Sequence, residues 1–220
     1  MSTPTVNIWT YGCSLTAGYE ELKLTNKVWP HHLDIGIPFN VINRANVGKS
    51  FYDASQKLLN DIGKIKKNDL VIFQLTFSHR LYLPYFTEEY DSYYKVRDWH
   101  LPKGNPAWFQ YMKESDGLDF TLKEESLVLF RLMNRLGIKF MWWTLNLYDD
   151  TILEEFSDNK LSIEKEPCYW AWIEKNYKIH YRRNDMHVNE DGHKLIAQSF
   201  SPQIINYLNI KETPIKKNIL

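Results

Sequence analysis

A serine stands between two glycines directly after the first apolar run of the chain. Ser14 lies in the segment 12–18, Gly-Cys-Ser-Leu-Thr-Ala-Gly, and the apolar run before it covers residues 6–11. Where a strand turns into a helix, a serine hydroxyl projects from the sheet edge and its backbone N–H is free to bind an anion. Ser14 is therefore a candidate nucleophile. The alternative interpretation is a helix cap, since serine is a favoured capping residue and Gly12 suits a tight turn.

A possible base and its carboxylate partner lie near the other end of the chain. Asp185 and His187 precede an apolar segment at residues 194–200. In an extended backbone, side chains two residues apart point to the same side, so one loop can supply both groups. A serine hydroxyl reacts when a histidine takes its proton and a carboxylate orients that histidine. Together with Ser14, these residues have the types of a catalytic triad, although Asp185 could instead cap the helix that follows.

The elements that must position these residues alternate along the chain. Apolar runs at residues 6–11, 39–42, 70–75 and 138–145, with a weaker fifth at 177–181, read as buried strands. Helical segments are expected at residues 53–62, 122–136 and 192–200, the last interrupted or ended by Pro202. Such alternation predicts a three-layer α/β/α, flavodoxin-like fold with about five parallel strands and its site at their carboxyl edge.

The helix at residues 122–136 has the clearest pattern. Thr121 and Glu124 suggest a capping box at its start, and Gly137 suits a left-handed cap at its end. Its apolar face is predicted to hold Leu122, Leu129, Phe130, Met133 and Leu136.

Composition limits the environment of the protein and its partners. Lysine plus arginine equal aspartate plus glutamate at 27 each, so no net charge attracts nucleic acid or an anionic membrane. Two cysteines, Cys13 and Cys168, are too few for a disulfide framework. The first residues lack the basic and apolar regions of a leader, and no uncharged stretch approaches the roughly 18 residues of a membrane span. A soluble, cytoplasmic protein of one domain (1–210) with a tail (211–220) is expected.

Two long excursions near residues 81–120 and 148–177 are rich in aromatic residues. Connections of that length are uncommon unless they form lids, binding loops or added subdomains. Aromatic side chains there are expected mainly to pack in a core or lid, and the alternative is a flat platform for sugar rings.

Three blocks of residues, taken in order, resemble the SGNH or GDSL-type hydrolase family. The family's first block, Gly-x-Ser-x-x-x-Gly after the first strand, is similar to residues 12–18. Its second block, an asparagine and a glycine after the second strand, is similar to residues 43–48. Its last block, an aspartate and a histidine before the final helix, is similar to Asp185 and His187. The resemblance covers most of the chain.

The sequence departs from the family pattern at three places. Cys13 stands where the family has an aspartate before the serine, and Asp185 lies two rather than three residues before His187. The third block, Gly-x-Asn-Asp after the third strand, is absent, and Ser78 occupies the position of its asparagine. Loss of one oxyanion donor lowers turnover by about 100- to 1000-fold. Thr76 and His79 are alternative donors.

The resemblance implies acyl transfer through serine. Ser14 would attack an ester carbonyl, His187 would take its proton, and Asp185 would hold the imidazole tautomer. The backbone N–H groups of Ser14 and Gly48, with the side chain of Ser78, would form the oxyanion hole. Neither a metal nor an organic cofactor is implied.

The substrate class that the family and the aromatic residues favour is a carbohydrate carrying O-acetyl esters. Two alternatives stay open on the sequence alone. One is a lipase- or thioesterase-like hydrolase of acyl chains. The other is a non-catalytic glycan-binding or structural module that keeps the fold.

Overall fold

A central parallel sheet organises the chain. The computed structural model describes residues 5–18, 26–76, 82–83, 94–95, 117–145, 150–180 and 187–209. Within these residues four parallel strands pair in the order β2-β1-β3-β6, the order of a flavodoxin-like fold. The strands are β1 (Val6–Tyr11), β2 (Phe39–Asn43), β3 (Leu70–Leu75) and β6 (Lys139–Thr144). A separate antiparallel pair joins β4 (Tyr82–Leu83) and β5 (Tyr94–Lys95).

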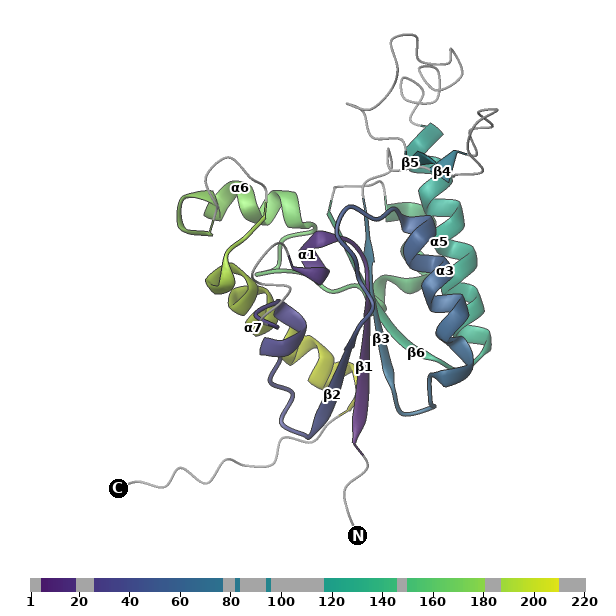
Figure 1. The fold of residues 1–220 in the computed structure, drawn as a ribbon, viewed down its shortest axis with the longest axis horizontal. Coiled ribbons are helices and arrows are strands. Elements are labelled where there is room, and N and C mark those ends of the chain that lie inside the picture. The colour runs from purple at the N-terminus through teal and green to yellow at the C-terminus, as the bar shows by residue number, and fades with distance from the viewer. Residues whose placement is uncertain are drawn as a thin grey trace.

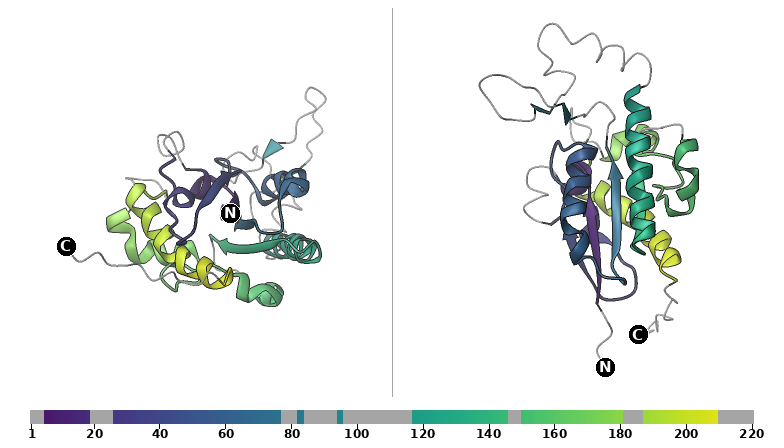
Figure 2. Two further views of the ribbon diagram at one scale, coloured as in Figure 1. Left: turned by 90° about the horizontal axis from the view of Figure 1, so that it is seen from below. Right: turned by 90° about the vertical axis from the view of Figure 1, so that its right-hand side faces the viewer.

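Helices cover both faces of the sheet, as the alternating pattern predicts (Figure 1). The α-helices are α1 (Ser14–Ala17), α3 (Phe51–Asp61), α5 (Gly117–Arg135), α6 (Tyr169–His180) and α7 (Glu190–Tyr207). The 3₁₀ helices are η1 (Trp29–His32), η2 (Ile62–Lys64) and η4 (Asp150–Asn159). Two further views show the sheet between α3 and α5 on one side and α7 on the other (Figure 2).

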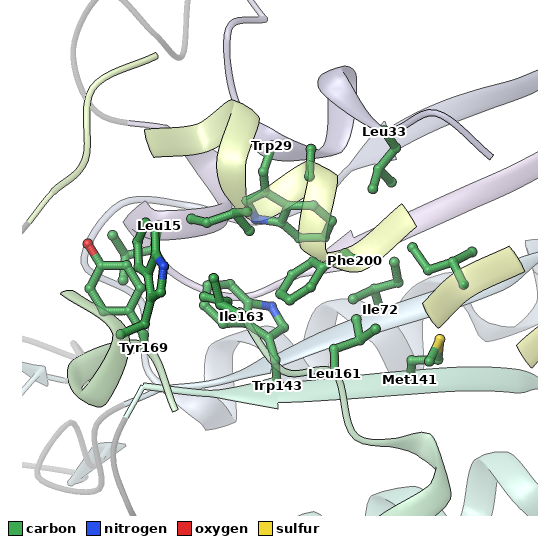
Figure 3. Close-up of a cluster of buried hydrophobic side chains, with 14 of the residues drawn as sticks. Leu15, Trp29, Leu33, Ile72, Met141, Trp143, Leu161, Ile163, Tyr169 and Phe200 are labelled. Carbon is green, nitrogen blue, oxygen red and sulfur yellow. The ribbon is translucent and has the colours of Figure 1, made fainter. Parts of the chain in front are cut away.

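Each face of the sheet contributes to its own hydrophobic core. All six residues of β3 are buried, and their side chains alternate between the two cores. Val71, Phe73 and Leu75 face α3 and α5. On the other face the rings of Trp29 and Trp143 both pack edge-on against Phe200 of α7, with ring centroids 5.1 and 5.5 Å away (Figure 3). Burial on both faces explains why this strand reads as an uninterrupted apolar run.

The helix predicted at residues 122–136 is real but begins earlier. Helix α5 starts at Gly117, so Thr121 lies inside it and the predicted capping box is wrong. Gly137 adopts a φ of 66°, which confirms the left-handed cap. Leu136 follows the last helical residue and is 54% exposed, so its assignment to the apolar face is also wrong. The capping signal at Thr121 did not mark the start of the helix, because the four residues before it are helical as well.

The prediction of a weak fifth strand at residues 177–181 is wrong. Residues 177–180 form the end of α6. Within α6, Tyr169, Trp172 and Ile173 are buried at helical spacing, and this packing sets the structure of the turns that follow. Helix α7 is longer than predicted and runs through Pro202 without ending there. Proline removes its own N–H bond and its ring crowds the carbonyl four residues earlier, but the burial of Phe200 and Ile204 holds the turns on either side of it against the sheet.

Aromatic residues of the second excursion serve the cores. Phe156 of η4 and Tyr169 and Trp172 of α6 are buried. The indole N–H of Trp142 donates to the carbonyl of Phe156 at 2.9 Å, which fastens η4 to the sheet. Core packing is therefore the role of these rings. Apart from β4, β5 and the start of α5, the excursion at residues 81–120 lies outside the described residues.

No helix among the described residues is long and apolar enough to cross a membrane.

Candidate active site

Ser14 opens α1 immediately beyond the carboxyl end of β1. Only Gly12 and Cys13 separate the strand from the helix. Gly12 has a φ of 155°, and a side chain at this position would place its Cβ 2.6 Å from the Cβ of Gln74, closer than real Cβ atoms approach. Gly18 ends the helix with a φ of 81°, and its N–H donates to the carbonyl of Ser14 at 2.8 Å. Both glycines are therefore required by the sharp turn that presents Ser14.

His187 reaches Ser14 across 173 positions of the sequence. The Nε2 atom of His187 lies 2.6 Å from the Oγ atom of Ser14, within hydrogen-bond distance. Ser14 is 4% exposed, whereas His187 is partly exposed. The arrangement is that of a serine hydroxyl with an imidazole placed to take its proton.

Helix α7 fixes the backbone that carries His187. The side chain of Asn189 caps this helix by accepting from the N–H of Gly192 at 3.0 Å. Val188 is buried and lies so close to Gly192 that a Cβ added to the glycine would be 2.9 Å from Val188 Cγ1. The two residues after His187 are therefore held in place, Val188 by packing and Asn189 by its hydrogen bond, and both limit the movement of His187.

The loop between β2 and α3 brings Gly48 to the same edge of the sheet. The backbone of this loop is tied to β1 and to the turn that carries Ser14, because the N–H of Arg44 donates to the carbonyl of Thr10 at 2.8 Å and that of Asn46 to the carbonyl of Gly12 at 3.2 Å. Gly48 is buried and has a φ of 67°.

Two backbone donors lie at this edge of the sheet. In the described part of the chain, no acceptor takes the backbone N–H of Ser14 or of Gly48. Both are thus available to a negatively charged oxygen.

A buried carboxylate anchors the loop that carries Gly48. Asp61 accepts from Arg44 Nε at 2.7 Å and from Lys64 Nζ at 2.8 Å, and the Tyr11 hydroxyl lies 3.4 Å away. Burial alone would raise the pKa of the Asp61 carboxyl, but the hydrogen bonds from Lys64 and Arg44 outweigh it and lower the pKa. Burial, with the Asp61 charge beside it, raises the pKa of Tyr11, so its hydroxyl stays protonated.

Two of the predicted site residues lie outside the described residues. These are Asp185 and Ser78, and their proposed roles stay predictions. Thr76, one alternative donor for the oxyanion site, is fully buried directly after β3, and His79 is also outside the described residues.

Gln74 is the residue of this region that sequence reasoning missed. Its Oε1 atom accepts from the N–H of Cys13 at 3.0 Å and from the hydroxyl of Thr16 at 2.8 Å. From the other side, the Asn43 amide donates to the carbonyl of Thr16 at 2.8 Å. The signal that could have found Gln74 is a polar residue one position before the end of an otherwise apolar strand.

Helix α7 carries a buried histidine, His193. Its Nδ1 atom accepts from the backbone N–H of Trp29 at 3.3 Å. Burial, with repulsion from His32 and His187, lowers the pKa of His193 to about 3. No group of three or more His, Cys, Asp or Glu side chains among the described residues is arranged to hold a metal ion.

The depressed pKa of His193 predicts a loss of stability in mild acid. The unfolded chain binds a proton at this histidine below about pH 6.5, whereas the folded chain does not until about pH 3. The stability that neutral His193 contributes is therefore present above pH 6.5 and is lost as the pH drops towards 3. Between pH 6.5 and 5, the His193→Asn variant should lose about 2 kcal/mol less than the native chain. Urea unfolding at both pH values measures the difference, and equal losses in the two proteins would contradict it.

Three solved structures share this architecture at low sequence identity. The psychrotrophic esterase EstA from Pseudoalteromonas sp. matches with a TM-score of 0.57 and 13% identity, over 92% of this chain and 98% of that one. TesA matches at 0.55 and 12%, over 91% and 99%. A member of the lipolytic protein G-D-S-L family from Veillonella parvula matches at 0.52 and 12%, over 89% and 96%.

These similarities are visible in structure alone. No family model and no curated protein sequence matches the chain. The order of the sheet, the position of the serine turn and the overall coverage agree with the sequence-based expectation of the fold. The chain has the fold of the G-D-S-L lipolytic proteins.

Proposed function

We propose that the protein is a serine esterase in which Ser14 is the nucleophile. The observation that carries the proposal is the 2.6 Å contact between Ser14 Oγ and His187 Nε2, which joins two ends of the chain at the carboxyl edge of the sheet. A serine that only capped a helix would need no imidazole at its hydroxyl. The shared fold with an esterase, EstA, supports the same reaction class.

The proposed reaction proceeds in two steps. His187 takes the proton of Ser14 as the oxygen attacks the ester carbonyl, and it then protonates the departing alcohol. Water, activated by the same imidazole, hydrolyses the acyl-serine and frees the carboxylic acid. The backbone N–H groups of Ser14 and Gly48 stabilise the oxyanion, with Ser78 as a third donor. Asp185 holds the imidazole tautomer.

The proposed substrate is an O-acetyl ester on a carbohydrate. Aromatic rings of the second excursion pack in the cores, so this choice depends on the resemblance and on the aromatic composition of residues 81–120. Hydrolysis of longer acyl esters in preference to acetyl esters would instead indicate a lipase- or thioesterase-like enzyme.

The proposal is tested with two probes of the native chain and of Ser14→Ala. Para-nitrophenyl acetate measures hydrolysis, and a fluorophosphonate reagent followed by peptide mass spectrometry locates the reactive serine. We expect the native chain to turn over and to be labelled at Ser14, and Ser14→Ala to do neither. A folded native chain that neither hydrolyses the ester nor is labelled would establish a non-catalytic module. Comparison of acetyl, butyryl and octanoyl esters, and of an acetylated oligosaccharide, then tests the substrate class.

A further inference from the structure

We infer that Gln74 is a positioning residue for the nucleophile, because its carboxamide oxygen holds the turn that presents Ser14. The inference rests on the proposed function, since a positioning role requires that Ser14 reacts. Gln74 lies on β3, whereas Ser14 follows β1, so the contact joins two neighbouring strands at the edge where the site lies.

The hydrogen bonds of Gln74 reach both sides of Ser14. Its Oε1 atom accepts from the N–H of Cys13, one residue before the serine, and from the hydroxyl of Thr16, two residues after it. Gln74 itself is fully buried, so water does not compete for either bond. One oxygen atom therefore fixes the backbone before the nucleophile and a side chain beyond it.

The turn is short, so its shape depends on contacts with neighbouring segments. Helix α1 has four residues, too few for a helix to be stable by itself. Gly12 lies directly against the Gln74 side chain, where any added Cβ would overlap it. The Gln74 side chain therefore contacts the turn from Gly12 to Thr16, and a change in either one displaces the other.

Packing alone does not explain an amide at this position. The residues of β3 that point to the same side, Leu70 and Ile72, are apolar. The Nε2 atom of Gln74 is buried and has no partner among the described residues. A buried donor without a partner destabilises a fold, and methionine or leucine would fill the space without one. The hydrogen bonds that the amide oxygen accepts from the turn explain why an amide stands here despite its unpaired donor.

Loss of this oxygen should affect the reaction more than binding. The N–H of Ser14 and its hydroxyl must both be directed at the carbonyl in the transition state, and a misplacement of about 1 Å costs about 100-fold in rate. Substrate held by other surfaces is still bound. We therefore expect a fall in kcat with little change in KM.

The test compares two substitutions of Gln74. We expect Gln74→Met to lower kcat by about 10- to 100-fold, to leave KM within about two-fold, and to slow fluorophosphonate labelling of Ser14 by the same factor as kcat. A Gln74→Glu variant, which burial keeps protonated, retains a carbonyl oxygen that accepts both bonds and should recover most of the lost kcat. Should Gln74→Met fail to fold, Thr16→Val removes one of the two bonds and should give a smaller fall in kcat.

A matched control is available on α7. Gln203 also joins distant segments, since its Oε1 atom accepts from the N–H of Ser162 at 3.1 Å and its Nε2 atom donates to the carbonyl of Ser162 at 2.7 Å. Gln203→Met should lower the melting temperature with native kcat. Native kcat in Gln74→Met, or an equal loss of kcat in both methionine variants, would overturn the inference.

The two proposals fail in different ways. Full hydrolysis by Ser14→Ala would reject Ser14 as nucleophile and, with it, the role of Gln74. An inactive Ser14→Ala beside a fully active Gln74→Met would reject the role of Gln74 alone.

Discussion

Replacing His187 with alanine is expected to lower kcat for ester hydrolysis by about 10⁴- to 10⁶-fold, with the fold retained. The imidazole is the group within reach of the Ser14 proton, at 2.6 Å from the hydroxyl oxygen. Without it, Ser14 attacks as a neutral alcohol, which is a weak nucleophile. Because His187 is partly exposed and does not belong to either buried cluster, its truncation leaves both cores intact.

Added imidazole distinguishes loss of the base from loss of structure. The space vacated in His187→Ala is open to solvent, so millimolar imidazole should restore part of the activity at neutral pH. The control is His31→Ala, which removes an exposed histidine from η1 and should keep native kcat. Activity of His187→Ala near the native value would exclude this histidine as the base. Loss of activity in both variants would show that the effect is not local to Ser14.

Much of the fold could be predicted from the sequence, because buried parallel strands leave a strong signal. Strands β1, β3 and β6 are largely buried and therefore appear as short apolar runs, whereas β2, at the edge of the sheet, is only half-buried and keeps two asparagines. Residues 177–181 gave a similar but weaker signal, and residues 177–180 belong to α6. A stretch of five residues is too short to show whether its apolar side chains repeat every 2 residues, as in a strand, or every 3.6, as in a helix. The buried rings of Tyr169 and Trp172, earlier in the same segment, favour the helix.

The candidate site likewise has residues that the sequence predicts and one that it does not. Residue types and their order marked Ser14, Gly48 and His187, because nucleophile, tight turn and base each need a particular side chain or a glycine. Gln74 gave no chemical signal of this kind, only that of a polar residue near the end of an apolar strand. A glutamine in a strand carries no chemistry by itself, and its importance arises from the approach of Gly12, a contact between strands that no local pattern records.

Replacing Gly12 with alanine should have the largest effect on the turn itself. The alanine Cβ would overlap the Gln74 side chain in a fully buried region, and the φ of 155° is strained for any residue but glycine. Overpacking and backbone strain together should lower the free energy of unfolding by about 2–5 kcal/mol. Chemical denaturation measures this loss. Activity should fall by more than about 100-fold even where the variant is folded, because relief of the overlap moves the turn away from β3.

Gly36 separates the strain of the backbone from the overlap with Gln74. It also has a positive φ, 71°, but a Cβ there would meet no atom within 4 Å. Gly36→Ala should therefore cost only the conformational strain, about 1–2 kcal/mol, and should keep native kcat. If Gly12→Ala were no worse than Gly36→Ala in stability and activity, the contact between the turn and Gln74 would have no role in holding Ser14. A larger loss at Gly12 in both measurements would show that the close approach of β1 and β3 sets the position of the nucleophile.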